Sequence, residues 1–335
     1  MQIDKTFGGK FLQGCGCLSI GIVVLLIIIC IIPMDDEEET AEDQQQEAQT
    51  AQVEKKDSVV VTEAMEGDPY KELDELIGLE QVKEEVRSLS NFVKVQKQRE
   101  AQGMKRPKMS YHLVFTGSPG TGKTTVARIV ARIYKDLGVL KKGHTVETDR
   151  SGLVAAYVGQ TAIKTNEVID SALNGVLFID EAYALVPEKK ANDYGQEAIS
   201  TLLKRMEDDR DKLVVIVAGY TDEMKRFIDS NPGLKSRFNR YINFPDYSGK
   251  ELYDIFCMYA RKNQYQLSPE AEVHLKKLFD YAVAHKDRNF GNARFARNIF
   301  EKSIQRQANR LANVKNATKE QLTILTEDDV KWGSK

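Results

Sequence analysis

The sequence predicts an α/β protein built on a doubly wound parallel sheet, followed by a helical lid and preceded by one transmembrane helix and an acidic linker. Three apolar runs predict the sheet, because such runs are typical of strands buried on both faces of a parallel sheet. Helical patterns of apolar residues separate the runs, as in strand–helix–strand units. The runs lie within Tyr111–Phe115, Val176–Ile179 and Lys212–Gly219.

Composition places the chain among globular proteins. Its 335 residues are 41% hydrophobic and 29% charged, which excludes a fully disordered chain and a protein with many membrane spans. Of the four cysteines, only Cys257 lies outside the N-terminal apolar run. A disulfide framework is therefore not expected in the rest of the chain, and a reducing compartment is favoured.

The net charge of −2 conceals an uneven distribution. Residues 1–68 hold fourteen acidic residues and four lysines, a net charge of −10, whereas the remaining residues carry a net charge of +8. The segment 35–68 is rich in Glu, Asp and Gln and has no aromatic residue. Such a segment cannot bury enough apolar surface to offset the entropy of ordering. We therefore expect residues 35–68 to form a disordered acidic linker, with a specific acidic docking site as the alternative.

A continuous apolar run predicts a membrane span over residues 12–34, after a short N-terminal tail of residues 1–11. No charged residue occurs from Cys15 to Ile32. With its uncharged flanks the run would extend about 36 Å as a helix, more than a hydrocarbon core of about 30 Å. A buried core helix and a cleavable signal peptide are the alternatives. Because no small-x-small cleavage site follows the run, we expect an uncleaved anchor.

A phosphate-binding motif follows the first apolar run. Residues Gly117–Thr125 match G-x-x-x-x-G-K-[ST], the Walker A pattern of a P-loop, between a predicted strand and a predicted helix. The glycines let backbone N–H groups converge on phosphate oxygens, and the helix N-terminus adds its dipole. The expected nucleotide contacts come from Gly117, Pro119, Gly120, Thr121, Gly122, Lys123, Thr124 and Thr125.

Four side chains supply the predicted chemistry. Lys123 would reach the β- and γ-phosphates, and the Thr124 hydroxyl would coordinate Mg²⁺. The second apolar run ends in Asp180 and Glu181, at the sheet edge where open α/β folds bind ligands. Asp180 can hold Mg²⁺, and Glu181 can act as the general base toward the attacking water. The expected cofactors are ATP and Mg²⁺, and the expected reaction is ATP hydrolysis.

The orientation of the predicted span follows from this chemistry. Lys5 and Lys10 precede the span and favour a cytoplasmic N-terminus, which would place the rest of the chain outside. Two lysines are a weak bias, however, and ATP is supplied in the cytosol. We expect a bacterial single-pass membrane protein whose ATP site lies in the cytoplasm.

The predicted domains continue with an α/β nucleotide-binding part over residues 69–246 and a helical lid over residues 247–335. None of the four histidines lies at metal-ligand spacing, and no zinc-finger, helix-turn-helix or RNA-binding signature is present. The helical patterns of the lid extend over 249–263, 268–285 and 292–313, followed by a short segment near 325–330.

Five further segments carry a family resemblance. They are Asp149–Ala162, Gly195–Ile199, Leu202–Glu207, Asn231–Phe238 and Gly291–Arg294. With the phosphate-binding motif, they make the chain similar to the AAA+ ATPases, and most closely to the group that contains CbbX and stage V sporulation protein K. The similarity extends from about Glu72 to Asp329, roughly three quarters of the chain. The resemblance implies self-association into a ring, with a hexamer as the expected assembly.

The resemblance also implies roles for individual residues. Ile77, Gly78 and Leu79 would contribute backbone and apolar contacts to the adenine. Arg237 resembles an arginine finger, which enters the neighbouring subunit's site and stabilises charge on the γ-phosphoryl oxygens. Arg294 resembles the sensor-2 arginine that ties the lid to the nucleotide. A surface salt bridge is the alternative for Arg237, and for Arg294 the alternative is that it is one of several basic residues in the region, among them Arg288 and Arg297.

Tyr157, Val158 and Gly159 fit the aromatic–hydrophobic–glycine loop that lines the central pore of AAA+ rings and grips a threaded polypeptide. An aromatic side chain can wedge between backbone units without reading sequence, and glycine lets the loop move. A buried tyrosine at a helix end is the alternative. One position departs from the family pattern, because Tyr220 stands where an asparagine is usual, and no sensor-1 residue is assigned.

The leading function hypothesis is a membrane-tethered ring ATPase that remodels, unfolds or disassembles protein substrates by pulling on chain segments at the pore. A nucleic-acid motor or loader is the second hypothesis, since the same fold occurs in ATPases that act on proteins and in ATPases that act on nucleic acids. No nucleic-acid partner is expected. The positive charge after residue 68 is spread through surface helices, and the negative charge of residues 1–68 would oppose binding. A nucleotide-switched scaffold is a third hypothesis. The sequence identifies no particular protein substrate.

Overall fold

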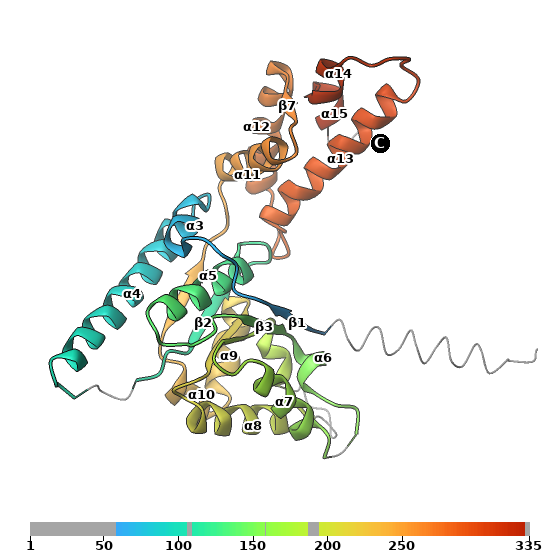
Figure 1. The fold of residues 1–335 in the computed structure, drawn as a ribbon. Helices are drawn as coiled ribbons and strands as arrows, with labels where there is room; N and C mark the ends of the chain where they lie inside the picture. Colours follow the sequence, from blue (N-terminus) through green and yellow to red (C-terminus); the bar gives the residue numbers. More distant parts are fainter. Residues whose placement is uncertain (1–57, 106–108, 158, 187–193, 332–335) are drawn as a thin grey trace, which may run out of the picture. The chain divides into compact units, whose positions relative to one another are not determined.

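A six-stranded sheet forms the centre of the α/β part (Figure 1). The structure, a computed structural model, describes residues 58–105, 109–157, 159–186 and 194–331, which belong to one unit of the chain. The strand order is β1-β3-β4-β5-β2-β6. The strands are β1 (Val59–Thr62), β2 (Leu113–Gly117), β3 (Thr145–Thr148), β4 (Val176–Ile179), β5 (Val214–Gly219) and β6 (Tyr241–Phe244).

Strands β2 to β6 run parallel to one another, which confirms the predicted parallel sheet. The three strands predicted from apolar runs are β2, β4 and β5, and every residue in them is buried. Strand β6 lies at one edge, and its residues alternate between exposed and buried. An edge strand with one solvated face lacks the continuous apolar run of a central strand, so the sequence did not mark β6.

Helices cover both faces of the sheet, as a doubly wound fold requires. Leu113 and Phe115 of β2 pack into a core with α3, α4 and α5, whereas Val114 packs into a second core with α7, α8, α9 and α10. Figure 1 shows these two sets of helices on opposite sides of the strands. The helices are α3 (Pro69–Glu75), α4 (Glu80–Ala101), α5 (Lys123–Asp136), α6 (Arg150–Leu153), α7 (Thr161–Ser171), α8 (Gly195–Asp208), α9 (Thr221–Asp229) and α10 (Pro232–Arg237).

The C-terminal part is a helical lid, as predicted. Three aromatic side chains, Phe256, Phe279 and Phe300, are buried and bring α11, α12 and α13 together. A short parallel pair, β7 (Gln266–Leu267) and β8 (Ile324–Leu325), joins the end of the lid to the segment between α11 and α12. The lid helices are α11 (Gly249–Lys262), α12 (Pro269–Ala284), α13 (Ala293–Leu311), α14 (Lys319–Thr323) and α15 (Glu327–Val330).

The C-terminal end of the predicted disordered linker, residues 35–68, contains strand β1, so the prediction was wrong there. Residues 59–62 were expected to be disordered, but they pair antiparallel with β3 at the edge of the sheet. The Thr148 hydroxyl donates to the carbonyl of Ser58 at 3.1 Å, and Val59 packs against the second core. The run of valines at 59–61 explains the difference, because these β-branched residues favour a strand despite the acidic composition around them.

The predicted membrane span at residues 12–34 lies outside the described residues. Within the described part of the chain, no helix is both long and apolar enough to cross a bilayer.

Replacing Gly152 by alanine should displace β1. A Cβ atom at Gly152 in α6 would lie 2.0 Å from the Thr148 hydroxyl oxygen and 2.8 Å from the Ser58 carbonyl oxygen. We expect Gly152→Ala to destabilise the domain by about 1–3 kcal/mol, the usual cost of overpacking a buried position. Thermal unfolding measures the effect, and Ser200→Ala, at an exposed position of α8, should cost less than about 0.5 kcal/mol. Equal unfolding temperatures for the two variants would show that β1 does not pack on α6.

Candidate functional site

The phosphate loop connects β2 to α5, as the motif predicts. Gly117, Gly120 and Gly122 have φ values of 142°, 71° and 96°, which residues with side chains rarely adopt. A Cβ atom at Gly117 would lie 2.3 Å from the carbonyl oxygen of Phe244, and one at Gly120 would lie 2.1 Å from that of Gly291. The backbone is therefore packed too closely for side chains. This leaves its N–H groups as the surface offered to a ligand.

A cleft of about 940 Å³ lies between this loop, the segment before α4 and the lid. Its volume is that of a site for a small molecule or cofactor. Gly78, Thr121 and Arg237 do not line it, nor do Tyr157 and Gly159. The residues predicted from sequence that do line it are Ile77, Leu79, Gly117, Pro119, Gly120, Gly122, Lys123, Thr124, Thr125, Asp180, Glu181 and Arg294.

Lys123 is the first residue of α5 and bonds back to its own loop. Its ammonium group donates to the carbonyl oxygens of Gly117 at 2.9 Å and Ser118 at 2.8 Å. Burial lowers the pKa of Lys123, and the carboxylates of Asp180 and Glu181 oppose this shift. A cation held only by neutral carbonyl oxygens can exchange them for phosphate oxygens, which interact more strongly with it.

Asp180 and Glu181 follow β4 at its carboxyl end. The Asp180 carboxylate accepts a hydrogen bond from the backbone N–H of Glu181 at 3.0 Å, which fixes its orientation. Glu181 has a φ of 48°, in the left-handed region, and its side chain is exposed. A non-glycine residue in this region is strained, and such strain clusters at functional sites. The residue that should act as general base thus has a strained backbone and an exposed side chain at the cleft.

The oxygen donors in the cleft suit a magnesium ion. The Thr124 hydroxyl and the Asp180 carboxylate line the cleft together with Lys123. Mg²⁺ takes oxygen ligands and is usually bound through one or two protein groups together with the phosphates of its substrate. The residues present therefore fit the magnesium–nucleotide complex that the motif predicts.

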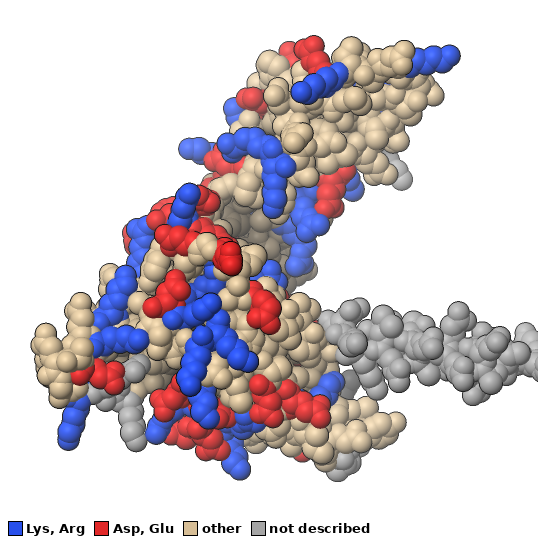
Figure 2. All heavy atoms as spheres, viewed as in Figure 1, with Lys and Arg blue, Asp and Glu red and all other residues tan. Residues whose placement is uncertain are grey.

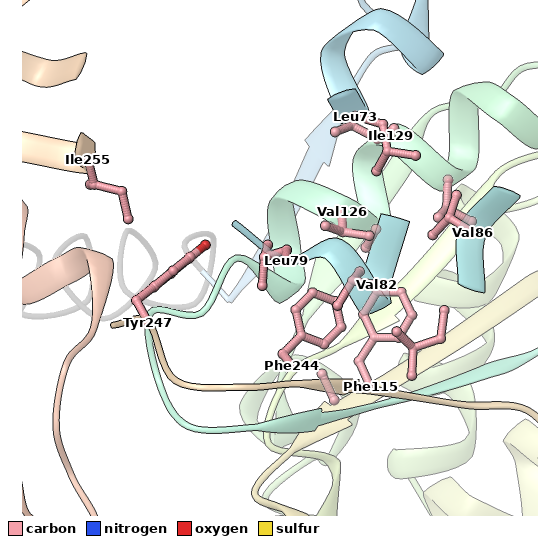
Figure 3. Close-up of a cluster of buried hydrophobic side chains, with 14 of the residues drawn as sticks. Leu73, Leu79, Val82, Val86, Phe115, Val126, Ile129, Phe244, Tyr247 and Ile255 are labelled. Atoms are coloured by element: carbon pink, nitrogen blue, oxygen red, sulfur yellow. The ribbon is translucent and has the colours of Figure 1, made fainter. Parts of the chain in front are cut away.

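The other end of the cleft is apolar. Ile77 and Leu79 lie on one side, and Tyr247 and Ile255 lie on the side of the lid. Figure 3 shows Tyr247 between Leu79 and Ile255. Gly78 lies between these two residues but does not line the cleft. Its φ is 62°, and a Cβ atom there would lie 2.1 Å from the Glu251 carboxylate, so a side chain does not fit at this position. An apolar surface on which a flat nucleotide base can lie is thus present next to the phosphate loop.

Asn292 fastens the lid to the phosphate loop, and the sequence did not identify this role. Its side chain is fully buried and donates to the carbonyl oxygen of Pro119 at 3.3 Å and to the carboxylate of Asp246 at 2.9 Å. Its amide oxygen accepts from the backbone N–H of Tyr247 at 3.0 Å. The only sequence signal was the Gly-Asn pair before a predicted helix. This pair does not predict a lid contact, because the hydrogen-bond partners of Asn292 are distant in the sequence.

Two arginines of α13 extend into the cleft. Arg294 lines it as predicted, and Arg297, one helical turn later, lines it as well. The backbone N–H of Ala293 donates to the carbonyl oxygen of Gly120 at 3.1 Å, so the start of α13 touches the phosphate loop directly. Positive charge from the lid therefore faces the same space as Lys123.

Tyr220 lines the cleft at the start of α9. Its ring lies 6.2 Å from that of Tyr183, and the Arg288 guanidinium carbon lies 5.5 Å from its centre. Arg288 belongs to the lid and also pairs with Glu223 of α9. The residue that departs from the family pattern thus contacts the lid as well as the cleft.

The residues outside the cleft lie in two other places. Arg237 ends α10, with its guanidinium 3.4 Å from the Glu207 carboxylate of α8. Tyr157 lies between α6 and α7 with 69% of its surface exposed, and Gly159 has a φ of 77°. The alternative of a buried tyrosine is therefore wrong. Val158 lies outside the described residues.

Comparison with known proteins agrees with this geometry. Residues 113–246 match the family described as the ATPase family associated with various cellular activities (AAA), and residues 248–335 match the AAA lid domain. The crystal structure of the FIGL-1 AAA domain in complex with ADP has a TM-score of 0.57 at 16% identity and covers 81% of this chain and 84% of its own. At that identity the likeness shows the fold alone.

Closer relatives are found by sequence. Stage V sporulation protein K of Bacillus subtilis is 43% identical over 264 residues, which are 78% of this chain and 81% of that protein. Protein CbbX of Cereibacter sphaeroides is 44% identical over 78% of this chain and 84% of its own. The chloroplastic ribulose bisphosphate carboxylase/oxygenase activase of Cyanidioschyzon merolae is 45% identical over 76% of this chain and 87% of its own.

Two substitutions separate nucleotide binding from hydrolysis. Lys123→Ala should abolish ATP binding, because it removes the cation that faces the phosphates. Glu181→Gln should bind ATP but hydrolyse it at least about 100-fold more slowly, the usual contribution of a general base. A fluorescent ATP analogue and a phosphate-release assay measure the two steps. Lys135→Ala, at the exposed end of the same helix, should behave as wild type. Turnover near normal in Glu181→Gln would exclude Glu181 as the base.

Asn292→Ala should loosen the lid from the phosphate loop. The substitution leaves the half-buried Pro119 carbonyl and the buried Tyr247 N–H without this partner, at a cost of about 1–3 kcal/mol. We expect a lower unfolding temperature and about tenfold weaker ATP binding, measured by thermal unfolding and nucleotide titration. Asn289→Ala, at an exposed position three residues earlier, serves as the control. ATP affinity unchanged in Asn292→Ala would mean that the lid contact does not support the site.

Proposed function

Since the chain belongs to the AAA family of ATPases and is an ATP hydrolase, we propose that it couples hydrolysis to the remodelling of protein substrates in a ring of identical subunits. The observation that carries the proposal is the exposed aromatic side chain of Tyr157 on a loop of the ATPase domain. Three of the relatives found by sequence support the class of activity, and one of them is named as an activase of another enzyme.

In the proposed site, ATP lies in the cleft with its base against Ile77 and Leu79 and its phosphates on the glycine-rich loop. Lys123 binds the terminal phosphates, while Thr124 and Asp180 hold the magnesium ion that neutralises part of their charge. Glu181 accepts the proton of the attacking water. These groups act mainly by positioning and by electrostatics, since phosphoryl transfer asks little covalent chemistry of the protein.

Arg237 is proposed to complete the site of the neighbouring subunit. It does not line the cleft of its own chain and lies instead at the end of α10. Arg294 and Arg297 already supply positive charge from the lid of the same chain. A guanidinium brought from the neighbour makes hydrolysis depend on assembly, which suits a machine whose subunits act in turn. A hexamer is the assembly that we propose.

Tyr157 is proposed to grip the substrate in the pore of that ring. Its loop begins directly after α6, whose first residue follows the Asp149 cap at the end of β3. Because β3 pairs with β4, and Asp180 directly follows β4, the loop is connected to the nucleotide site through neighbouring strands. A change at the magnesium side of the site can therefore move the base of the loop.

We also propose that residues 12–34 tether the ring to a membrane, with residues 35–57 as an acidic spacer and the ATPase in the cytoplasm. The spacer's negative charge would keep the domain away from anionic lipid headgroups.

Figure 2 shows acidic and basic side chains interspersed over one face of the molecule. That face offers no continuous basic surface to a nucleic-acid backbone, which favours a protein substrate over the alternative.

Tyr157→Ala should uncouple hydrolysis from substrate. We expect basal ATPase within about twofold of wild type, because Tyr157 does not line the cleft, and the loss of stimulation by a permanently unfolded polypeptide such as reduced, carboxymethylated lactalbumin. Tyr281→Ala is the matched control, because Tyr281 is an exposed tyrosine of the lid. Stimulation preserved in Tyr157→Ala would exclude the gripping role. Strong stimulation by DNA, unaffected by the substitution, would favour a nucleic-acid motor.

A further inference from the structure

The Arg237 guanidinium is loosely held by its own chain. Its polar contacts, to the Glu207 carboxylate, the Gly233 carbonyl and the Ser236 hydroxyl, are all 3.4–3.5 Å long. Its Nε atom is buried and has no hydrogen-bond partner among the described residues. The guanidinium therefore has unused hydrogen-bonding capacity, and its present contacts are at the weak limit of the distance range.

The backbone of the same residue is firmly held. The Ser110 hydroxyl donates to the carbonyl oxygen of Arg237 at 2.7 Å. At the start of the helix, the Asn231 side chain caps α10 by accepting from the N–H of Gly233 at 2.7 Å. The N–H of Phe238 closes the helix at 2.9 Å from the Leu234 carbonyl oxygen. A weakly held guanidinium on a fixed backbone is the arrangement needed by a side chain that must act in a neighbouring subunit.

The residues that follow Ser110 are held by buried contacts. His112 is 3% exposed, its Nδ1 atom accepts from the N–H of Val215 at 2.9 Å, and its ring lies 5.9 Å from that of Phe238. Burial lowers the pKa of His112 to about 4, so its ring is neutral at pH 7. The N–H of Val114 donates to the Arg240 carbonyl oxygen at 2.9 Å. The residues that follow Ser110 and those that follow Arg237 are thus joined as well.

We infer that Ser110 is a positioning residue for Arg237 and sets where that arginine enters the neighbouring subunit's site. The inference rests on the proposed role of Arg237. The Ser110 hydroxyl reaches the last carbonyl of α10, which helix geometry leaves without an internal partner. Because Ser110 leads into β2 and β2 ends in the phosphate loop, the same strand connects a subunit's own nucleotide to the arginine that it donates.

The test uses mixed rings of full-length chains in which only one kind of site can work. A chain with Glu181→Gln has no general base but keeps Arg237. A chain with Arg237→Ala keeps its base but donates no arginine. If Arg237 acts in the neighbouring site, mixing the two restores hydrolysis at the sites of the Arg237→Ala chains. Ser110→Ala is then placed in one chain or the other.

In the Glu181→Gln chain, Ser110→Ala should lower the kcat of the mixed rings about five- to tenfold, the value of one hydrogen bond that orients a reacting group. The KM for ATP should stay within about twofold, and Ser110→Thr, which keeps the hydroxyl, should restore the rate. In the Arg237→Ala chain, Ser110→Ala should have no effect on the rate, because that chain donates no arginine.

Two outcomes overturn the inference while leaving the role of Arg237 intact. One is restored hydrolysis that Ser110→Ala in the Glu181→Gln chain does not reduce. The other is an equal loss with Ser110→Ala in either chain, which would place the effect in the chain's own phosphate loop or in folding. If the parent mixture without Ser110→Ala shows no restored hydrolysis, the proposed role of Arg237 fails, and the inference fails with it.

Discussion

The close approach of two backbones, at Gly120 of the phosphate loop and Gly291 of the lid, is the constraint on which the site depends. A single methyl group at Gly120 would collide with the Gly291 carbonyl oxygen. On the other side of the loop, Gly117 is equally close to the carbonyl oxygen of Phe244. The loop that should bind phosphates is thus held between the sheet and the lid, and the buried side chain of Asn292 joins the loop to the segment that follows β6. A change in the backbone of the phosphate loop must therefore displace atoms in both the sheet and the lid.

Strand β2 extends this coupling across the domain. Its carboxyl end becomes the phosphate loop, and the residues before its amino end hold the segment that carries Arg237. Parallel neighbours fix it on both sides, since β5 and β6 pair with it. In the proposed ring, a subunit's own site and its contribution to the next site would therefore lie at the two ends of one buried strand. Such a strand transmits displacement because packed interiors deform little.

The sequence could predict those parts of the fold and site that are local in the chain. The phosphate loop and the Asp180–Glu181 pair each follow a buried apolar strand, so composition and order were sufficient. Strand β1 was missed because three valines lie within an otherwise acidic segment. Tyr247 and Asn292 were missed because their roles come from contacts with residues more than a hundred positions away. The roles of Arg237 and Tyr157 rest on family resemblance, and the structure adds where their side chains lie.

Hydrogen–deuterium exchange of the Glu181→Gln chain, with and without ATP and Mg²⁺, tests most directly whether the nucleotide site is shared between the sheet and the lid. Opening of a local segment is what backbone exchange reports. ATP should slow exchange both in the phosphate loop, residues 117–125, and in the lid, at residues 291–297 and 247–259. Protection confined to the phosphate loop, with the lid exchanging as fast as before, would contradict a nucleotide site shared between the sheet and the lid.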